Sequence, residues 1–331
     1  MPLTLAQAKV GMANHVDQTV IDEFRRSSLL MDKLTFDNSV SPGTGGSTLV
    51  YGYLRLKTPS TAAFREINAE YTASEAVKEA KSVALKIFGG KFSIDRVLAQ
   101  TSGKINEVEF QLNQLIKATT NMFHNAVING DSSVAGFDGL DVMLAGTSTE
   151  FNTSAQNAID ISTSANLDSN YKKVLDMLDE LLASVDGTPT MIMGNTKMIT
   201  KLQACARRAG YLTQSEDAFG KKVSAYNSIP LVDLGYYYSG SATKAVVPIT
   251  KRSYGSTGSQ TEVTGLTDLY AVRLGLDAFH GVSLTGNNII STHMPDFTTE
   301  GAVKSGDVEM VAATALKNSR AAAVLRNFKV E

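Results

Sequence analysis

The chain has few of the residues on which several common classes of function depend. Among its 331 residues there is one cysteine, Cys205, and no tryptophan. A single cysteine cannot form a disulfide within the chain, so the sequence gives no sign of an oxidising compartment. The formal net charge is -2, from 31 Lys and Arg against 33 Asp and Glu, so the excess positive charge typical of a nucleic-acid-binding protein is missing. No run of about 18 apolar residues occurs, so we expect no membrane-spanning helix and no membrane partner.

Motifs for catalysis and cofactor binding are also missing. The glycine-rich run at residues 43–47 precedes an expected strand instead of joining a strand to a helix, and Gly-Lys-Ser or Gly-Lys-Thr occurs nowhere, so no phosphate loop is predicted. There is no Gly-x-Ser-x-Gly elbow for a serine nucleophile. Four histidines have no spacing suited to zinc: His15, His124, His280 and His293. We therefore predict no catalytic, cofactor-binding or metal-binding residue, and we do not expect the protein to be an enzyme.

A few polar residues invite a functional interpretation and have a simpler structural one. Cys205 lies between two alanines of an expected helix, which favours a small buried residue over a nucleophile. His124 lies beside the apolar stripe of another helix and is expected to pack or to form a hydrogen bond. The spacing of Asp131, Asp138 and Asp141 does not match a calcium-binding EF-hand loop. Residues 118–171 contain six acids and no Lys or Arg, and a polar connector is the favoured interpretation over a cation site.

The most informative stretch of the chain is residues 103–128. It contains no proline and no internal glycine, and it ends abruptly at Asn129-Gly130-Asp131. Its apolar stripe, in steps of three and four, consists of Ile105, Val108, Leu112, Leu115, Thr119, Met122 and Ala126, widened by Ile116, Phe123 and Val127. A helix of this length would measure ~39 Å. Most globular helices are shorter, so the pattern predicts a protein organised around a long helical spine.

A long charged hairpin is predicted before this helix. Residues 41–47 have the composition of a turn or linker, and residues 49–57 alternate as a strand. A return strand is expected over residues 82–88 and 92–94, with a bulge or bend at Gly89-Gly90. The intervening residues are rich in charge and have no apolar face of their own. Because an isolated two-stranded ribbon is marginal in water, this hairpin is expected to lie on another surface.

The remaining pattern predicts an α+β or α/β module. An arm helix is expected at residues 14–30, and further helices at residues 168–185 and 196–208, the last ended by Gly210. Expected strands are residues 191–193, 229–234 and 245–249, one long half-buried strand at 268–284, and two strands within 308–330. Residues 252–265 are expected to form an exposed loop. The start of the sequence has neither a basic region nor a continuous apolar region, so we expect no secretory signal.

The order of these parts resembles the major capsid proteins of tailed bacteriophages, which have the Hong Kong 97 type fold. The resemblance rests on the hairpin from VYGYLRLKTPS to SVALKIFGGKFSIDRVLAQ, the helix KINEVEFQLNQLIKATTNMFHNAV, the following INGDSSVAGFDGL, and residues 189–195 and 225–232. It implies an α+β fold with an N-terminal arm at 1–46 and an extended β-hairpin loop at 47–92. A peripheral domain would comprise 93–165, with the spine helix 103–128, and 268–331. Residues 166–267 would form the axial domain.

The resemblance also implies a function. Such a protein self-assembles into pentamers and hexamers of an icosahedral shell that encloses phage double-stranded DNA, in the virion and, during assembly, in the host cytoplasm. Its partners would be other copies of itself, a portal and a scaffolding protein. We expect the scaffolding protein to be a separate chain, since this chain reaches its arm helix by residue 14. Contact with packaged DNA would be weak and non-specific. The alternatives are an encapsulin-type compartment shell, a phage tail or tube protein and, from another class, a hydrolase or nucleotide-dependent enzyme.

Overall fold

The computed structural model describes residues 28–37, 49–101, 106–210, 213–216, 222–256, 258–284 and 289–331. The helices are α2 (Leu29–Lys33), α3 (Arg96–Thr101), α4 (Glu107–Asn129), α5 (Leu140–Leu144), α6 (Ser164–Ser184), α7 (Thr196–Ala209) and the 3-10 turn η2 (Ala155–Asn157). The first strands are β1 (Phe36–Asp37), β2 (Val50–Thr58), β3 (Val77–Ala84), β4 (Lys86–Asp95), β5 (Glu150–Phe151), β6 (Ile159–Asp160), β7 (Met191–Gly194), β8 (Thr213–Glu216) and β9 (Lys222–Tyr226). The later strands are β10 (Ile229–Asp233), β11 (Tyr236–Tyr238), β12 (Thr243–Ala245), β13 (Thr250–Tyr254), β14 (Thr261–Val272), β15 (Phe279–Ser283), β16 (Ile290–His293), β17 (Val303–Leu316) and β18 (Ala322–Lys329).

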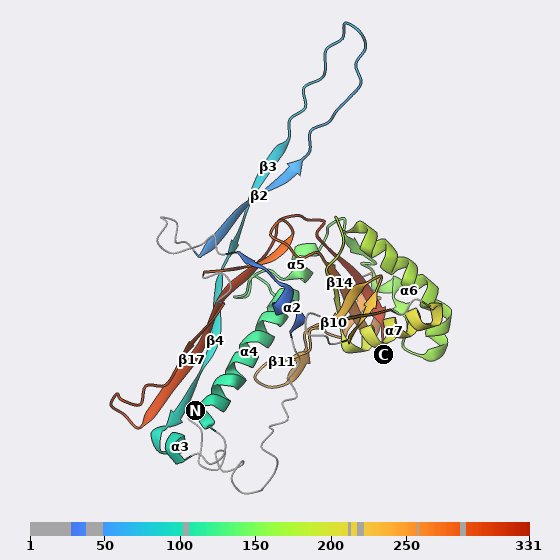
Figure 1. Ribbon diagram of the computed structural model, residues 1–331. Helices are drawn as coiled ribbons and strands as arrows, with labels where there is room; N and C mark the ends of the chain where they lie inside the picture. Colours follow the sequence, from blue (N-terminus) through green and yellow to red (C-terminus); the bar gives the residue numbers. More distant parts are fainter. Residues whose placement is uncertain are drawn as a thin grey trace.

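The molecule has three visibly different parts (Figure 1). The β2–β3 hairpin projects away from everything else. An elongated part is built along α4, β4 and β17, and a rounder part is built from the sheet around β14 with α6 and α7. Most of the arm helix expected at residues 14–30 and all of the linker expected at 41–47 lie outside the described residues. The described end of that arm contains the short helix α2.

Helix α4 confirms the predicted spine. It begins after Asn106, whose side chain accepts hydrogen bonds from the backbone N–H groups of Val108 and Glu109 at 3.1 and 3.3 Å. It ends at Asn129, where the N–H of Gly130 donates to the carbonyl of Ala126 at 2.9 Å. Residues 102–105 are outside the described part, so the expected start at 103 is not addressed. Helix α3, just before them, was not expected.

A five-stranded sheet lies beside α4, with β4 paired antiparallel to β17 over ten residues, from Asp95 opposite Val303 to Lys86 opposite Ala312. This pairing corrects the expected return strand, because β3 ends at Ala84 and β4 belongs to a different sheet. The bulge expected at Gly89-Gly90 is also wrong, since the register runs through both glycines without a shift.

Close approach of neighbouring groups explains the two glycines instead. A Cβ added at Gly89 would lie 2.0 Å from the carbonyl oxygen of Val308, and one added at Gly90 would lie 2.6 Å from the Cδ1 atom of Leu115 on α4. Strand β4 therefore lies against both β17 and the helix at a distance that side chains would prevent.

The nine-stranded sheet forms the centre of the rounder part. Its order is β5-β18-β14-β7-β10-β9-β8, with β13 on β14 and β6 on β18. Strand β7 is parallel to β10 and antiparallel to β14. Neighbouring residues alternate between two cores: Tyr270 packs toward α4 and α5, whereas Leu269 and Ala271 pack toward α6 and α7. Burial on both faces explains why these strands have continuous apolar sequences.

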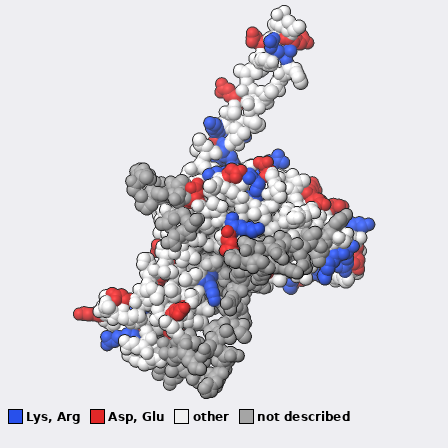
Figure 2. Space-filling model, viewed as in Figure 1, with Lys and Arg blue, Asp and Glu red and all other residues white. Residues whose placement is uncertain are grey.

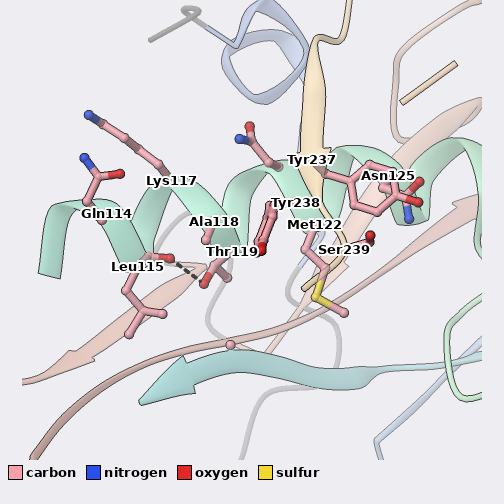
Figure 3. A pocket seen from close by; sticks show the side chains of 12 residues that line it. Gln114, Leu115, Lys117, Ala118, Thr119, Met122, Asn125, Tyr237, Tyr238 and Ser239 are labelled. Carbon is pink, nitrogen blue, oxygen red and sulfur yellow. Dashed lines mark hydrogen bonds between the residues drawn. The ribbon is translucent and has the colours of Figure 1, made fainter. Parts of the chain in front are cut away.

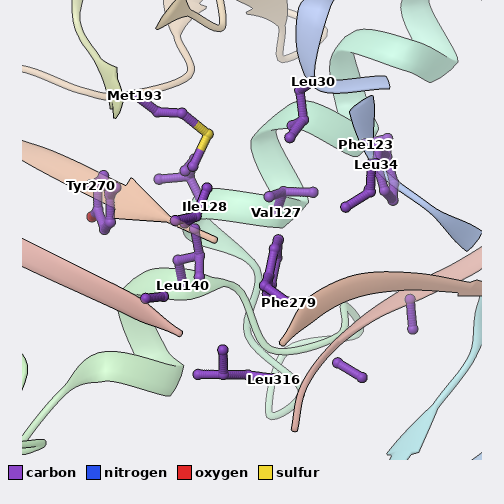
Figure 4. Close-up of a cluster of buried hydrophobic side chains, with 14 of the residues drawn as sticks. Leu30, Leu34, Phe123, Val127, Ile128, Leu140, Met193, Tyr270, Phe279 and Leu316 are labelled. Atoms are coloured by element: carbon purple, nitrogen blue, oxygen red, sulfur yellow. The ribbon is translucent and has the colours of Figure 1, made fainter. Parts of the chain in front are cut away.

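The core next to α4 joins the elongated part to the rounder part (Figure 4). Phe123, Val127 and Ile128 of α4 are fully buried there, with Phe279 of β15 and Leu140 of α5. Phe123 lies 6.0 Å from the ring centroids of both Phe36 and Phe137. Residues from distant parts of the sequence thus share one continuous core, which fixes the direction of α4 relative to both sheets.

Helices α6 and α7 cover the other face of the nine-stranded sheet (Figure 1). The predicted helix at 168–185 starts earlier than expected, because Thr163 is its N-cap and its hydroxyl accepts from the N–H of Asn166. The helix predicted at 196–208 is confirmed as α7, with Gly210 as a left-handed C-cap at φ 78°. The strands predicted at 191–193 and 229–234 and the two strands of the tail are also present.

Other sequence predictions in this region are wrong. Residues 268–284 are not one strand: β14 ends at Val272, and β15 starts at Phe279 in the other sheet. Between them the N–H of Ala278 donates to the carbonyl of Gly275 at 2.9 Å, which closes a turn. The expected loop at 252–265 is largely the β13–β14 hairpin, and most of 245–249 lies between strands. The polar segment after α5 contains the short strands β5 and β6, both parallel to β18.

Candidate assembly surfaces

Two tyrosines hold the root of the projecting hairpin. The hydroxyl of Tyr51 donates to the Oδ2 atom of Asp37 at 2.8 Å, and that of Tyr53 donates to the carbonyl of Leu316 at 3.1 Å. Burial raises the pKa of both phenols. The ring of Tyr51 also meets the buried ring of His280 edge to face, with centroids 5.7 Å apart. The hairpin is therefore attached to β1 and to the end of β17 at a defined angle.

Beyond this root, the shaft of the hairpin is covered by nothing in the described chain. Strands β2 and β3 pair from Val50 opposite Ala84 to Thr58 opposite Val77. The guanidinium of Arg55 lies 2.6 Å from Glu79, and this hydrogen bond lowers the pKa of Glu79. Leu54 and Leu56 are both exposed. The shaft is thus an exposed two-stranded ribbon, as the sequence predicted, of the kind that is marginal on its own in water.

The tip of the hairpin, residues 59–76, carries charges of both signs (Figure 2), and large apolar side chains lie among them. Phe64 is as exposed as in an isolated extended peptide, and Ile67 is 91% exposed. The tip has a local shape: the N–H of Ala69 donates to the carbonyl of Glu66 at 3.2 Å, and Arg65 lies 5.5 Å from the ring centroid of Tyr71. Exposed large apolar groups of this kind mark contact sites.

Sequence reasoning described this tip only as charged. The signal that could have shown more was the presence of Phe64, Ile67 and Tyr71 inside a charged run, where a purely solvated loop needs no large apolar side chain.

A second surface is a groove between α4 and β11 (Figure 3). Its volume is about 670 Å³. The described residues that line it are Gly89, Gln114, Leu115, Lys117, Ala118, Thr119, Asn121, Met122, Asn125, Tyr237, Tyr238 and Ser239. Met122 and Tyr238 are 52% and 63% exposed. Nothing in the sequence predicted this groove, because β11 reaches α4 only through the tertiary fold.

A cluster of charges connects α5 to the nine-stranded sheet. Arg326 contacts Asp141 at 2.5 Å and Asp268 at 3.1 Å, and it also pairs with Glu150. Arg252 makes a two-pronged contact with Asp268, at 2.7 Å on each side. The side chain of Asp268 is almost completely buried, so these ion pairs satisfy a charge that would otherwise be costly.

The three aspartates considered for calcium therefore have structural contacts. Asp141 belongs to the cluster around Arg326, while Asp131 and Asp138 accept the N–H groups of Ser133 and Ser132 at 2.7 and 2.9 Å. Across the described ranges, no group of three or more His, Cys, Asp and Glu is arranged to hold a metal ion.

The residues considered for chemistry are the cysteine and the histidines, and three of them, Cys205, His124 and His280, are buried in the packed interior. Cys205 is fully buried on α7, and burial raises the pKa of its thiol to about 11, which disfavours the nucleophilic thiolate. His124 is buried on α4, with Nε2 2.6 Å from the hydroxyl of Ser28. His280 is buried on β15, and His293 is exposed on β16. His15 lies outside the described residues. The described histidines are not brought together.

Solved structures share this fold over the full chain. The SrpI encapsulin from Synechococcus elongatus PCC 7942 is 17% identical, covers 100% of this chain and 97% of that chain, and has a TM-score of 0.63. The capsid of a native GTA particle is 10% identical, covers 98% of each chain, and has a TM-score of 0.59. The capsid of Myoviridae phage XM1 is 13% identical, covers 95% and 97%, and has a TM-score of 0.54. No protein-family model and no curated protein matches the sequence.

The chain therefore has the α+β, Hong Kong 97 type fold of tailed-phage major capsid proteins, and the resemblance inferred from the sequence is confirmed at the level of the fold. Within the described residues, none of the helices combines the length and the apolar character needed to cross a bilayer.

Proposed function

We propose that this chain is a major capsid protein that self-assembles into the pentamers and hexamers of an icosahedral shell enclosing phage double-stranded DNA. It would assemble in the host cytoplasm and reside in the virion. The observation that carries the proposal is the projecting hairpin, whose tip exposes Phe64 and Ile67 and has no surface of its own chain to cover them among the described residues. The shared fold, found in capsids and an encapsulin, supports the same conclusion.

The shape of the subunit fits such a role. A root fixed by Tyr51 and Tyr53 sets the direction of the hairpin, so its tip would meet a neighbouring copy at a defined place. The paired charges on the shaft, Arg55 and Glu79, keep 31% and 25% of their side chains exposed, and ion pairs at a protein surface contribute little each. Many weak contacts of this type would let subunits detach and correct their positions until a closed shell forms.

The proposed division of the chain follows the same fold. It consists of an arm at residues 1–46, an extended loop at 47–92, a peripheral domain at 93–165 and 268–331, and an axial domain at 166–267. Within this division, the part of the loop that projects ends near Leu85, because residues 86–92 pair with β17 in the sheet beside α4. The buried Leu85 lies at this transition.

The proposed partners are other copies of this chain, a separate scaffolding protein and a portal, with only weak non-specific contact to DNA. The formal net charge of -2 supports weak DNA contact, since strong binding to phosphates needs many Lys and Arg. We propose no catalytic activity and no cofactor, because among the described residues Cys205 is buried and the histidines lie apart from one another.

Electron microscopy of the purified protein, alone and with its scaffolding partner, tests the proposal. We expect closed shells from the wild type. Phe64→Asp and Ile67→Asp are expected to abolish shells while leaving the melting temperature of the subunit unchanged, because both side chains are exposed. Thr72→Asp is the matched control, since it adds the same charge to the same loop without removing an apolar group, and it should still assemble.

Several outcomes would contradict the proposal. A subunit that stays monomeric under all conditions would contradict shell formation, and normal shells from Phe64→Asp would contradict the role of the tip. Particles from the native source that enclose protein cargo and no DNA would instead indicate an encapsulin-type compartment. Rings or open tubes would indicate a tail or tube protein.

A further inference from the structure

The end of α4 carries the only Asn-Gly pair in the sequence, Asn129-Gly130. In such a pair the backbone nitrogen of the glycine can attack the side-chain amide carbon of the asparagine, because glycine has no Cβ to obstruct the approach. The attack forms a five-membered succinimide ring and releases ammonia, and water then opens the ring to aspartate or isoaspartate. Asn129 is exposed, so water reaches this pair.

The fold requires glycine at position 130. A Cβ added there would lie 2.3 Å from the carbonyl oxygen of Phe137 and 2.4 Å from that of Ala126. Both of these oxygens belong to the backbone and cannot move aside as the end of a side chain can. Close approach of the chain after α4 therefore explains why the residue that favours the reaction is present.

The amide of Asn129 has a structural role of its own. Its Nδ2 atom donates to the carbonyl of Val246 at 2.6 Å and to Oδ1 of Asn125 at 2.9 Å. Val246 follows β12 and is fully buried in the core next to α4. The next residue, Val247, accepts a hydrogen bond from Nδ2 of Asn195, the N-cap of α7, at 2.7 Å. Side-chain amides from the ends of two helices thus hold one short segment between β12 and β13.

The same contacts oppose the reaction while the last turn of α4 is closed. The N–H of Gly130 donates to the carbonyl of Ala126 at 2.9 Å, which holds the attacking nitrogen in the helical arrangement. The leaving nitrogen of Asn129 is held by its two acceptors. Attack needs rotation of the Asn129 backbone and side chain, so these bonds must break first. Helix ends open more readily than helix centres, so such openings occur in the folded subunit.

We propose that Asn129 is a deamidation site that reacts only when the end of α4 separates from Val246, and that the product keeps this junction open. Loss of ammonia and uptake of water replace the amide by a carboxylate, which has no N–H to donate to Val246. The new negative charge also lies at the C-terminal end of α4, where the helix dipole disfavours it. A transient opening thereby becomes a permanent change. This proposal goes beyond shell formation and does not depend on it.

Peptide mapping by mass spectrometry tests where and when the reaction occurs. The full-length subunit is incubated at neutral pH, native and unfolded in urea, and conversion of Asn129 is followed over weeks. We expect the native protein to react at least about tenfold more slowly than the unfolded chain, because reaction requires local opening. Asn125→Ala removes one acceptor of the Asn129 amide and should speed the native reaction. Asn121→Ala, on the same helix, is the matched control and should not.

Hydrogen exchange tests the effect of the product. Asn129→Asp carries the charge of the product, and we expect the amides of the last turn of α4 to exchange faster than in the wild type. Asn129→Ala loses the bonds without adding charge and should have a smaller effect. Circular dichroism confirms that each variant is folded. Neither measurement needs a shell, so a failure of assembly would not affect them.

Four results would each overturn part of the proposal. Absence of reaction at Asn129 in the unfolded chain would remove the site, and equal rates in native and unfolded protein would remove the protection by the fold. Equal native rates in Asn125→Ala and Asn121→Ala would contradict the role of the side-chain bonds. Wild-type exchange in Asn129→Asp would show that the product leaves the junction closed.

Discussion

The hydroxyl of Tyr51 donates to Asp37 over 2.8 Å, and this bond ties the first strand of the projecting hairpin to β1. Lys317 stands near the same pair, with its ammonium 5.4 Å from the Tyr51 ring centroid and 3.9 Å from Asp37. Because the hairpin is long, a small change in its angle at this root displaces its tip by a large distance. The position of the tip, on which assembly depends in the proposed function, is thus decided by a few polar contacts far from it.

Tyr51→Phe should loosen this root without unfolding the subunit. The ring and its packing remain, while one hydrogen bond to a charged acceptor is lost, at a cost of about 1 to 3 kcal/mol. We expect faster hydrogen exchange of the β2 amides, measured by mass spectrometry. Tyr238→Phe, an exposed tyrosine of β11, serves as the control. Unchanged exchange in β2 after Tyr51→Phe would show that the packing of the ring alone holds the hairpin.

Phe123→Ala should be among the most destabilising single changes in α4. Phe123 is fully buried and touches three other phenylalanine rings, of which Phe88 is stacked at 6.2 Å. Removing a buried aromatic side chain costs about 3 to 5 kcal/mol. Urea unfolding measures the loss, and the neighbouring Met122→Ala, at a half-exposed position, should cost far less. Equal losses of unfolding free energy at both positions would show that the face of α4 with Phe123 is not the face that packs in the core.

The two glycines of β4 are expected to differ in their tolerance of alanine. A Cβ at Gly89 would meet the backbone oxygen of Val308, which can move only by breaking the pairing with β17. A Cβ at Gly90 would meet the end of the Leu115 side chain, which can change rotamer. Gly89→Ala should therefore destabilise the subunit by about 1 to 3 kcal/mol and Gly90→Ala by less. Thermal unfolding that ranks the variants in the opposite order would refute this account.

Two buried histidines predict a loss of stability in acid. Burial lowers the pKa of His124 and of His280 from 6.5 to about 4, and for His280 the charge of Lys317 acts in the same direction, against Asp37 and Asp277. Between these pH values the unfolded chain binds more protons, so the free energy of unfolding falls as the pH drops below 6.5. The loss is complete below about 4.

Unfolding by urea at a series of pH values from 7 to 4 measures this effect. His280→Gln should reduce the slope of stability against pH over this interval, whatever its effect at pH 7. His293→Gln, at an exposed position, should leave the slope unchanged. A slope that persists after His280→Gln and His124→Gln would assign the acid sensitivity to other groups.

The predictions that succeeded concern elements whose signal is local. Helix α4 follows from side chains spaced along one stretch, and its end at Asn129 and Gly130 was visible in the sequence. The end of α7 at Gly210 was visible for the same reason. The projecting hairpin was anticipated because its residues could not bury themselves. The N-caps Asn106 and Thr163 were missed, although both are residue types that favour this position.

The predictions that failed concern which segments pair. Alternation of apolar residues continues from β14 through Leu274 to β15, so nothing local shows that the chain changes sheets at the Gly275 turn. The sequence also revealed only part of the candidate assembly surfaces. The hairpin was predicted, whereas its apolar tip was overlooked, and the groove at α4 depends on Tyr238 arriving from more than a hundred residues away.

The sequence by itself determined the spine helix, the two helices α6 and α7 and the exposed hairpin, because periodicity and turn chemistry act between residues close in the chain. The order of these parts carried the resemblance to a capsid fold. Only the tertiary structure decided that β4 leaves the hairpin to pair with β17, that β14 and β15 belong to different sheets, and where the groove lies. Strand pairing uses backbone groups that every residue carries, so its partners are selected by the packing of the whole core and cannot be read from one segment.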